Sequence, residues 1–177
     1  MEENIKPLNS WKFALRGGGM IALVMMVVSA VPYFIGNPMT GWTRWLAFIM
    51  FIIGIAWSQF YYRNNELGGF IKYNKSLGLG MQITLVCAVI LGVFAIVMVL
   101  TFPEVMQEAM KEQKRTMLEQ RYTEERVKLG MHYAAMFTTP VAIFFFSIVM
   151  YGILGLIVSS ITSVIIKKEN PELHFPE

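Results

Sequence analysis

Four long apolar stretches place the strongest limit on the structure that this chain can adopt. A membrane-spanning helix needs about 20 mainly apolar residues to cross a hydrocarbon core roughly 30 Å thick. Stretches that meet this requirement lie at residues 16–35, 42–62, 76–102 and 133–166. The last two contain no acidic residue, lysine or arginine. We therefore expect an all-α integral membrane protein, a four-helix bundle in which residues 1–177 form a single membrane domain.

The composition favours the same class of protein. Apolar residues make up 55% of the 177 positions and charged residues only 15%, and the mean hydropathy is +0.52. A soluble domain would need more polar surface. The net charge of +3 does not indicate nucleic-acid binding, because the basic residues flank apolar stretches, where they suit anionic lipid headgroups. We expect membrane lipids as partners and no nucleic acid.

The first apolar stretch has an alternative interpretation as a secretory signal peptide. Basic residues precede it, and Val28, Ser29 and Ala30 resemble a cleavage site. Glu2 and Glu3, however, make the preceding segment long and acidic for such a signal. We favour a retained helix.

The distribution of lysine and arginine predicts the orientation, because cytoplasmic loops are enriched in these residues. The connection after the first stretch contributes only Arg44. The amino-terminal segment, the second connection and the carboxy-terminal tail would lie on the opposite side of the membrane. They contribute Lys6, Lys12, Arg16, Arg63, Lys72, Lys75, Lys167 and Lys168. With four spans, both termini then lie in the cytoplasm. The connection 103–132 would lie outside, with six basic and six acidic residues.

This third connection has the pattern of a helical hairpin that extends the third and fourth spans beyond the bilayer. Thr101 and Glu104 have the order of a capping box, which predicts a helix over about 104–120. Thr123 predicts a second helix start, and this helix would continue into the fourth span. Apolar residues at helical spacing would pack within the hairpin, or against lipid or another subunit.

The connection between the second and third spans is the most distinctive polar segment. Gly68 and Gly69 permit a tight turn, and they are not a phosphate loop because the Gly-Lys-Ser/Thr end is missing. Arg63, Lys72 and Lys75 are candidate contacts for lipid headgroups. For this segment we favour a tight turn at the membrane surface over a substrate site.

Small residues recur four positions apart inside the spans. The pairs are Gly54 and Ser58, Ala88 and Gly92, and Gly155 and Ser159. Such pairs let helix backbones approach closely in lipid. They predict helix packing in a compact bundle or in a homo-oligomer.

The residues predict no catalytic, metal or cofactor site. The spans lack the ionisable groups that transport usually requires. His132 and His174 do not make a metal site, and no nucleophile-base-acid set is visible. Cys87 lies in apolar surroundings and is interpreted as a packing residue. We expect a protein that is not an enzyme.

Several motifs in order along the chain carry a family resemblance. They are Arg63, Glu66-Leu67-Gly68-Gly69, Tyr73, Lys75, Gly78 to Gly80, Thr123-Glu124-Glu125 and Ile165-Ile166-Lys167-Lys168. Together they resemble domain-of-unknown-function family 4199. The resemblance implies a small four-span protein of the bacterial inner membrane without an assigned activity. It also implies an envelope-assembly context, since genes of this family often neighbour genes of polyprenyl-phosphate glycosyltransferases.

Three functional hypotheses follow. The first is a non-enzymatic accessory or scaffold subunit in envelope assembly, whose hairpin binds a membrane protein such as a glycosyltransferase. The second is a lipid-handling protein, with Arg63, Lys72 and Lys75 meeting a polyprenyl phosphate or another anionic lipid. The third is an oligomeric channel or transporter, which the uncharged spans disfavour.

Overall fold

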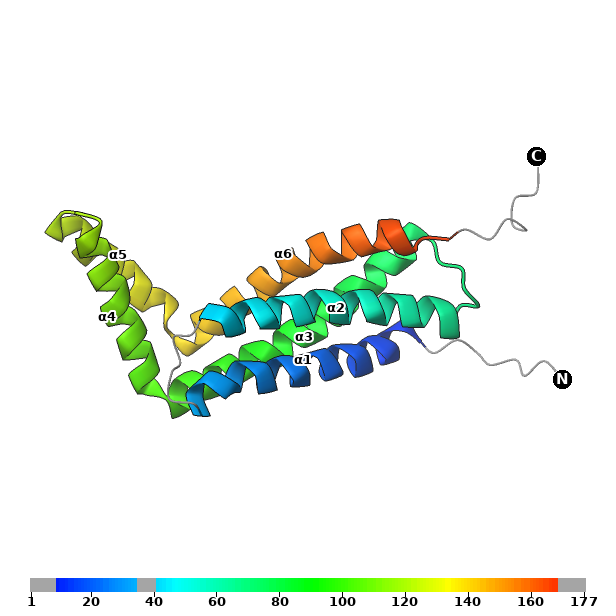
Figure 1. Cartoon of the computed structure of the whole chain (residues 1–177), viewed down its shortest axis with the longest axis horizontal. Coiled ribbons are helices and arrows are strands. Elements are labelled where there is room, and N and C mark those ends of the chain that lie inside the picture. The colour runs from blue at the N-terminus through cyan, green and yellow to red at the C-terminus, as the bar shows by residue number, and fades with distance from the viewer. Residues whose placement is uncertain (1–8, 35–40, 169–177) are drawn as a thin grey trace.

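The computed structural model describes residues 9–34 and 41–168, and six α-helices lie within these ranges. In chain order they are α1 (Ser10–Phe34), α2 (Gly41–Asn65), α3 (Tyr73–Thr101), α4 (Pro103–Glu119), α5 (Glu124–Phe137) and α6 (Pro140–Ile166). Four of them, α1, α2, α3 and α6, are long and apolar enough to cross a membrane. They lie side by side in one elongated bundle (Figure 1). The expectation of an all-α membrane bundle is confirmed.

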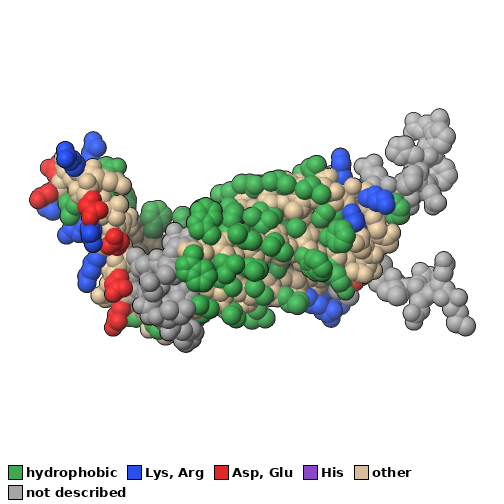
Figure 2. All heavy atoms as spheres, in the orientation of Figure 1, with side chains coloured by type: hydrophobic (Ala, Val, Ile, Leu, Met, Phe, Trp, Pro, Cys, Tyr) green, Lys and Arg blue, Asp and Glu red, His purple; other side chains and the backbone are tan. Residues whose placement is uncertain are grey.

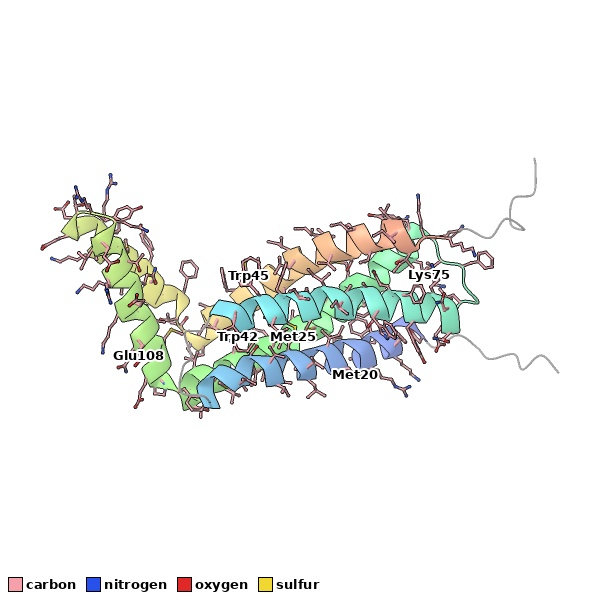
Figure 3. All side chains as sticks on the ribbon, in the orientation of Figure 1. Met20, Met25, Trp42, Trp45, Lys75 and Glu108 are labelled. Carbon is pink, nitrogen blue, oxygen red and sulfur yellow. The ribbon has the colours of Figure 1, made fainter. Side chains whose placement is uncertain are left out.

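The bundle has two chemically different ends. At the first, which we name the terminal end, α1 begins, α2 ends, α3 begins and α6 ends (Figure 1). The other is the hairpin end, where α4 and α5 lie. Figure 3 shows Lys75 at the terminal end, and Trp42 and Trp45 toward the hairpin end. Aromatic rings and basic groups near the ends of spanning helices are typical of the membrane interfaces.

The central helix is α3, which packs on α1, α2 and α6. Its contact with α6 depends on glycine. A Cβ atom added at Gly155 of α6 would lie 2.6 Å from the Cβ of Thr84, and one added at Gly80 of α3 would lie 2.7 Å from the Cβ of Ser159. Such separations leave no room for a methyl group. Because lipid tails are as apolar as the helices, this close backbone approach supplies much of the attraction between α3 and α6.

Backbone hydrogen bonds outside the helices connect segments of the chain at the terminal end. Gly68 and Gly69 have φ angles of 63° and 92°, so the predicted tight turn is confirmed. Ile71, which follows this turn, pairs with Lys168 after α6: the N–H of each donates to the carbonyl of the other, at 2.9 and 3.0 Å. The α2–α3 connection is therefore fastened to the end of α6.

Helices α4 and α5 fill the predicted hairpin, and α4 leaves α3 at a steep angle to the bundle axis (Figure 1). The predicted capping box is wrong. Thr101 is still the last residue of α3, and its hydroxyl donates to the carbonyl of Val97 at 2.7 Å. Phe102 occupies the N-cap position of α4, and no side-chain hydrogen bond caps this helix start. Pro103 is the first residue of α4, where the N–H that proline lacks would have no partner within the helix.

The structure also corrects the expected continuous helix from the hairpin into the fourth span. Helix α5 ends at Phe137, and α6 starts anew at Pro140. Proline cannot continue a helix, because it lacks the N–H and its ring clashes with an earlier carbonyl. Thr139 caps the new start, and its hydroxyl oxygen accepts from the N–H of Ala142 at 3.4 Å. The fourth span is therefore residues Pro140–Ile166.

Candidate functional site

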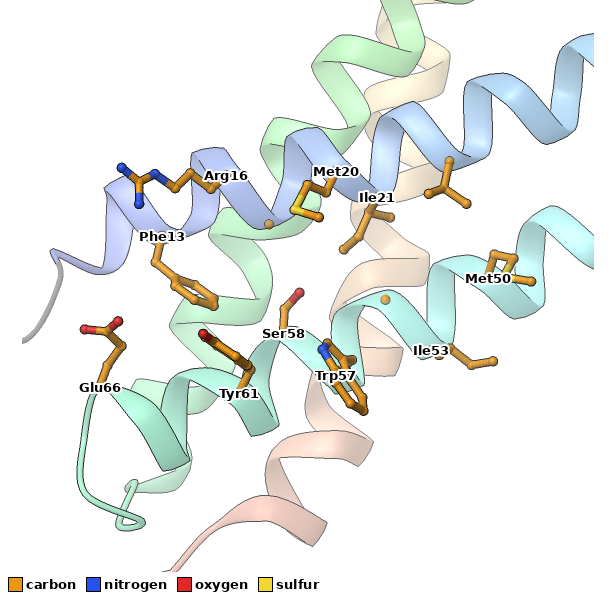
Figure 4. A pocket seen from close by; sticks show the side chains of 13 residues that line it. Phe13, Arg16, Met20, Ile21, Met50, Ile53, Trp57, Ser58, Tyr61 and Glu66 are labelled. Carbon is orange, nitrogen blue, oxygen red and sulfur yellow. The ribbon is translucent and has the colours of Figure 1, made fainter.

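A groove between α1 and α2 is the candidate functional site. It has a volume of about 660 Å³, and Figure 4 shows the side chains that line it. The volume lies in the range of small-molecule pockets, about 300–1,000 Å³. The groove is lined by Phe13, Arg16, Gly17, Met20, Ile21, Val24, Met50, Ile53, Gly54, Trp57, Ser58, Tyr61 and Glu66. Most of these side chains are apolar, so the groove suits an apolar ligand.

The floor of the groove exists because small residues bring α1 and α2 together. A Cβ atom added at Gly54 would lie 2.7 Å from Cγ1 of Ile21, and one added at Gly17 would lie 3.3 Å from Oγ of Ser58. Ile21 and Ser58 are each 8% exposed. A larger residue at Gly54 would therefore push the two helices apart and change the floor.

The walls consist of longer side chains that remain exposed in the bundle. On α1 they include Met20 and Val24, and on α2 they include Ile53 and Trp57. Their exposed fractions run from 49% for Val24 to 69% for Met20. Since α1 and α2 are candidate membrane spans, these side chains face lipid tails in a bilayer.

One end of the groove is polar. Arg16 of α1 and Glu66, which follows α2, lie at the same end in Figure 4, with Phe13 between them. Phe13 stacks on Tyr61, with ring centroids 6.1 Å apart and an interplanar angle of 17°. This polar end coincides with the terminal end of the bundle. The opposite end, at Met50, is apolar.

The part of the groove wall between Met50 and Tyr61 is about as long as half of a bilayer's hydrocarbon core is deep. From Met50 to Tyr61 its wall follows α2 for about 16 Å, at roughly 1.5 Å per residue. Half of the hydrocarbon core is about 15 Å deep. The groove thus extends from a charged end, where α2 ends, to an apolar end at Met50, beyond the midpoint of the candidate span Trp45–Asn65.

A buried polar cluster, consisting of Gln59, Ser76, Thr162 and Ser163, joins α2, α3 and α6. The amide Nε2 of Gln59 donates to the carbonyl of Ser76 at 3.0 Å and to Oγ of Ser163 at 3.4 Å. The hydroxyl of Thr162 donates to Oε1 of Gln59, and Oγ of Ser163 donates to Oγ of Ser76 at 3.0 Å. Gln59 is fully buried. The bonds of this cluster connect helix to helix, which is a structural role.

The three predicted headgroup contacts lie at the terminal end but do not line the groove. Arg63 Nη1 donates to the carbonyl of Ile166 at 3.1 Å, and its guanidinium lies 4.6 Å from the ring centroid of Phe60. Arg63 therefore provides a hydrogen-bond donor for a carbonyl at the C-terminus of α6, which has no partner within the helix. Lys72 and Lys75 are exposed beside the start of α3.

The six predicted packing residues lie at helix contacts or beside them. Gly54 and Ser58 belong to the floor of the groove. Gly155 and Ser159 face α3, as described above. Ala88 is fully buried, and a Cβ added at Gly92 would lie 2.9 Å from the ring of Phe144 on α6.

The sequence motifs do not single out Arg16 and Glu66 as residues that line one groove. A signal was present, because helices joined by a short connection run antiparallel. The start of the first span and the end of the second must then lie at the same interface. Arg16 stands at the first position and Glu66 at the second.

The geometry defines the class of protein: an all-α membrane protein with four candidate spanning helices and a helical hairpin at one end. Within residues 9–34 and 41–168, no group of three or more His, Cys, Asp or Glu residues could hold a metal ion. A family model described as "Protein of unknown function (DUF4199)" matches residues 12–168, so the chain belongs to this family. The resemblance stated from the sequence motifs is confirmed. Neither the curated proteins nor the solved structures contain a match to the chain.

Proposed function

We propose that this protein binds a membrane lipid in the groove between α1 and α2 and acts as a non-enzymatic lipid-binding component of the membrane. The observation that carries the proposal is the gradient along the groove, from Arg16 and Glu66 at the interface to Met50 at depth. A phospholipid has the same order of polar and apolar parts. Membrane lipids are also the ligands present at the highest concentration around the spanning helices.

The basic residues support an orientation for this site. The terminal end carries the lysines and arginines that flank the spans (Figure 2), and such residues favour the cytoplasmic side. We therefore propose a bacterial inner-membrane protein with both termini in the cytoplasm. The groove would then open to the cytoplasmic leaflet.

Lipid retention by the purified full chain tests this function. Val24 and Val27 are exposed residues on α1, and of the two only Val24 lines the groove. Val24→Trp should fill the groove, whereas Val27→Trp is the matched control on the same helix. After extraction in mild detergent, native mass spectrometry measures the bound lipid.

We expect the parent protein and Val27→Trp to retain the same number of lipid molecules per protein chain. Val24→Trp should lose most of the bound lipid. The groove would have no role in lipid binding if both variants retained the same amount. A parent protein without bound lipid would refute the proposed function directly.

A second function, the accessory subunit, is favoured by the outer face of α5. Three apolar residues there recur at helical spacing outside the spanning helices, and they are 52–55% exposed: Leu129, Tyr133 and Met136. An exposed apolar row of this kind suits another protein chain, such as a membrane glycosyltransferase or a second copy of this protein.

Photo-crosslinking in the native membrane tests the accessory role. A photoreactive residue in place of Leu129 should yield one defined protein adduct that is lost when Tyr133→Glu is added. The same residue in place of Lys128, exposed on another side of α5, is the control. Equal adducts from both positions would count against a docking face.

A further inference from the structure

A second groove, at the hairpin end of the bundle, carries an inference that goes beyond the proposed function. It lies where α4 and α5 meet the first turns of α6, and it has a volume of about 380 Å³. The residues that line this hairpin groove include Met106, Met110 and Gln113 of α4, Ala134 and Phe137 of α5, and Phe146 of α6. We propose that the hairpin groove binds one acyl chain of a phospholipid from the leaflet at the hairpin end.

The hairpin groove begins within a spanning helix and continues outside the spans. Phe146 belongs to the candidate span Pro140–Ile166 and lies about 9 Å from its start, at roughly 1.5 Å per residue. Phe146 is 55% exposed, and its ring centroid lies 6.3 Å from that of Phe137 on α5. Lipid tails surround the exposed side of a spanning helix. A tail that runs along Phe146 therefore enters the hairpin groove directly from the hydrocarbon core.

The lining of the hairpin groove suits a flexible apolar chain. Of the described residues that line it, none is charged. Met106 and Met110 are unbranched and polarisable, so their side chains adapt to an irregular apolar ligand. The hydroxyl of Thr138 already donates to the carbonyl of Ala135 at 2.7 Å. The volume lies near the lower limit of small-molecule pockets, about 300 Å³, so the hairpin groove suits one chain rather than a whole phospholipid.

Helix α4 has the residue pattern of a helix that lies at a membrane interface. It leaves α3 at a steep angle to the bundle axis, so it runs more along a membrane surface than away from it (Figure 1). Met106 and Met110 lie on the face of α4 that lines the hairpin groove. The exposed residues Glu108 and Lys111 lie on the opposite face. An interfacial helix of this kind places its apolar face at the boundary between headgroups and acyl chains.

The two grooves lie at opposite ends of the bundle. The groove between α1 and α2 has its polar end at the terminal end, whereas the hairpin groove lies at the hairpin end. Lipids bound in the two grooves would therefore have their headgroups at opposite membrane interfaces. Lipid binding in the hairpin groove does not depend on the groove between α1 and α2.

Photo-crosslinking of the full chain in its native membrane tests the inference. A photoreactive residue in place of Met110 should form an adduct whose added mass, measured by mass spectrometry, is that of a phospholipid. The same residue in place of Lys111, which is exposed on the opposite face of α4, is the control and should form no such adduct. Gln113 also lines the hairpin groove but is exposed, so the photoreactive residue there should form the lipid adduct without disturbing the packing.

A side chain that fills the hairpin groove should remove the adduct. Ala134→Trp places a large ring in the hairpin groove, whereas Ala135→Trp adds the same ring at the next position, which is exposed and outside it. The lipid adduct at Met110 should be lost in Ala134→Trp and retained in Ala135→Trp. Val24→Trp fills only the groove between α1 and α2, so it should leave the adduct at Met110 unchanged.

The outcomes separate this inference from the proposed function. Lipid adducts of equal yield at Met110 and Lys111 would overturn the inference, and so would an adduct with a protein chain in place of lipid at Met110. Loss of the Met110 adduct in Val24→Trp would show that the two grooves are not independent sites. If Met110 and Gln113 form no lipid adduct while Val24→Trp still lowers lipid retention, the inference fails and the proposed function stands.

Discussion

The contact between Gly155 and Thr84 allows a quantitative test of how the bundle is held together. A Cβ at Gly155 would lie 2.6 Å from the Cβ of Thr84, with Cγ2 and Oγ1 of Thr84 closer still. Thr84 is 1% exposed, so its side chain cannot turn into open space. Gly155→Ala must therefore separate α3 from α6 or distort the Thr84 rotamer.

The expected loss of stability can be worked out from two terms. Overpacking of a well-packed contact costs about 1–3 kcal/mol. Replacing glycine by alanine inside a helix stabilises the helix by up to about 1 kcal/mol, which offsets part of this cost. Gly152, one turn earlier on α6, has no atom within 4 Å of its added Cβ. Gly152→Ala therefore gains helix propensity without overpacking. The two variants should differ in unfolding free energy by about 1–3 kcal/mol, which is the cost of overpacking.

Unfolding in mild detergent, titrated with dodecyl sulfate and followed by circular dichroism, measures this difference. The double variant Gly155→Ala with Thr84→Gly removes the Thr84 side chain that the new methyl group would meet, and it should recover part of the loss. Thr84→Ala keeps the Cβ of Thr84 and should recover less. The reasoning is refuted if Gly155→Ala and Gly152→Ala have equal stability, or if Thr84→Gly brings no recovery.

Two further predictions concern the polar cluster and the topology. Gln59→Leu removes the helix-to-helix hydrogen bonds of a fully buried amide and should lower the unfolding free energy by about 0.6–1.7 kcal/mol. No change in the same dodecyl sulfate titration would show that the cluster is energetically neutral. With Cys87 replaced by serine, single cysteines at Asn74 and Gln113 should react with a membrane-impermeant maleimide from opposite sides of the membrane. Labelling of both from one side would contradict the four-span topology.

Helix boundaries show where sequence reasoning succeeded and where local signals misled it. The helix expected at 104–120 is α4, Pro103–Glu119, because a proline after an apolar span marks the change. Thr101 has the residue type of a cap, but α3 extends to include it, so its hydroxyl bonds back along α3. Pro140 marks a new helix start, since proline favours the first turn of a helix.

The sequence by itself determined the class, the spans and the polar hairpin. These features depend on local quantities, namely the length of apolar stretches and the positions of charged residues relative to the bilayer. Small residues such as Gly155 could be recognised as packing residues for the same reason, although their partners could not.

Only the tertiary structure decided which residues meet. Arg16 and Glu66 stand fifty positions apart in the sequence and line one groove because α1 and α2 pack through Gly17 and Gly54. Gln59 bonds to Ser163 because α2 and α6 approach each other from distant parts of the chain. Hydropathy is the same for every rotation of a helix about its axis, so the side chains that face one another follow from helix packing alone.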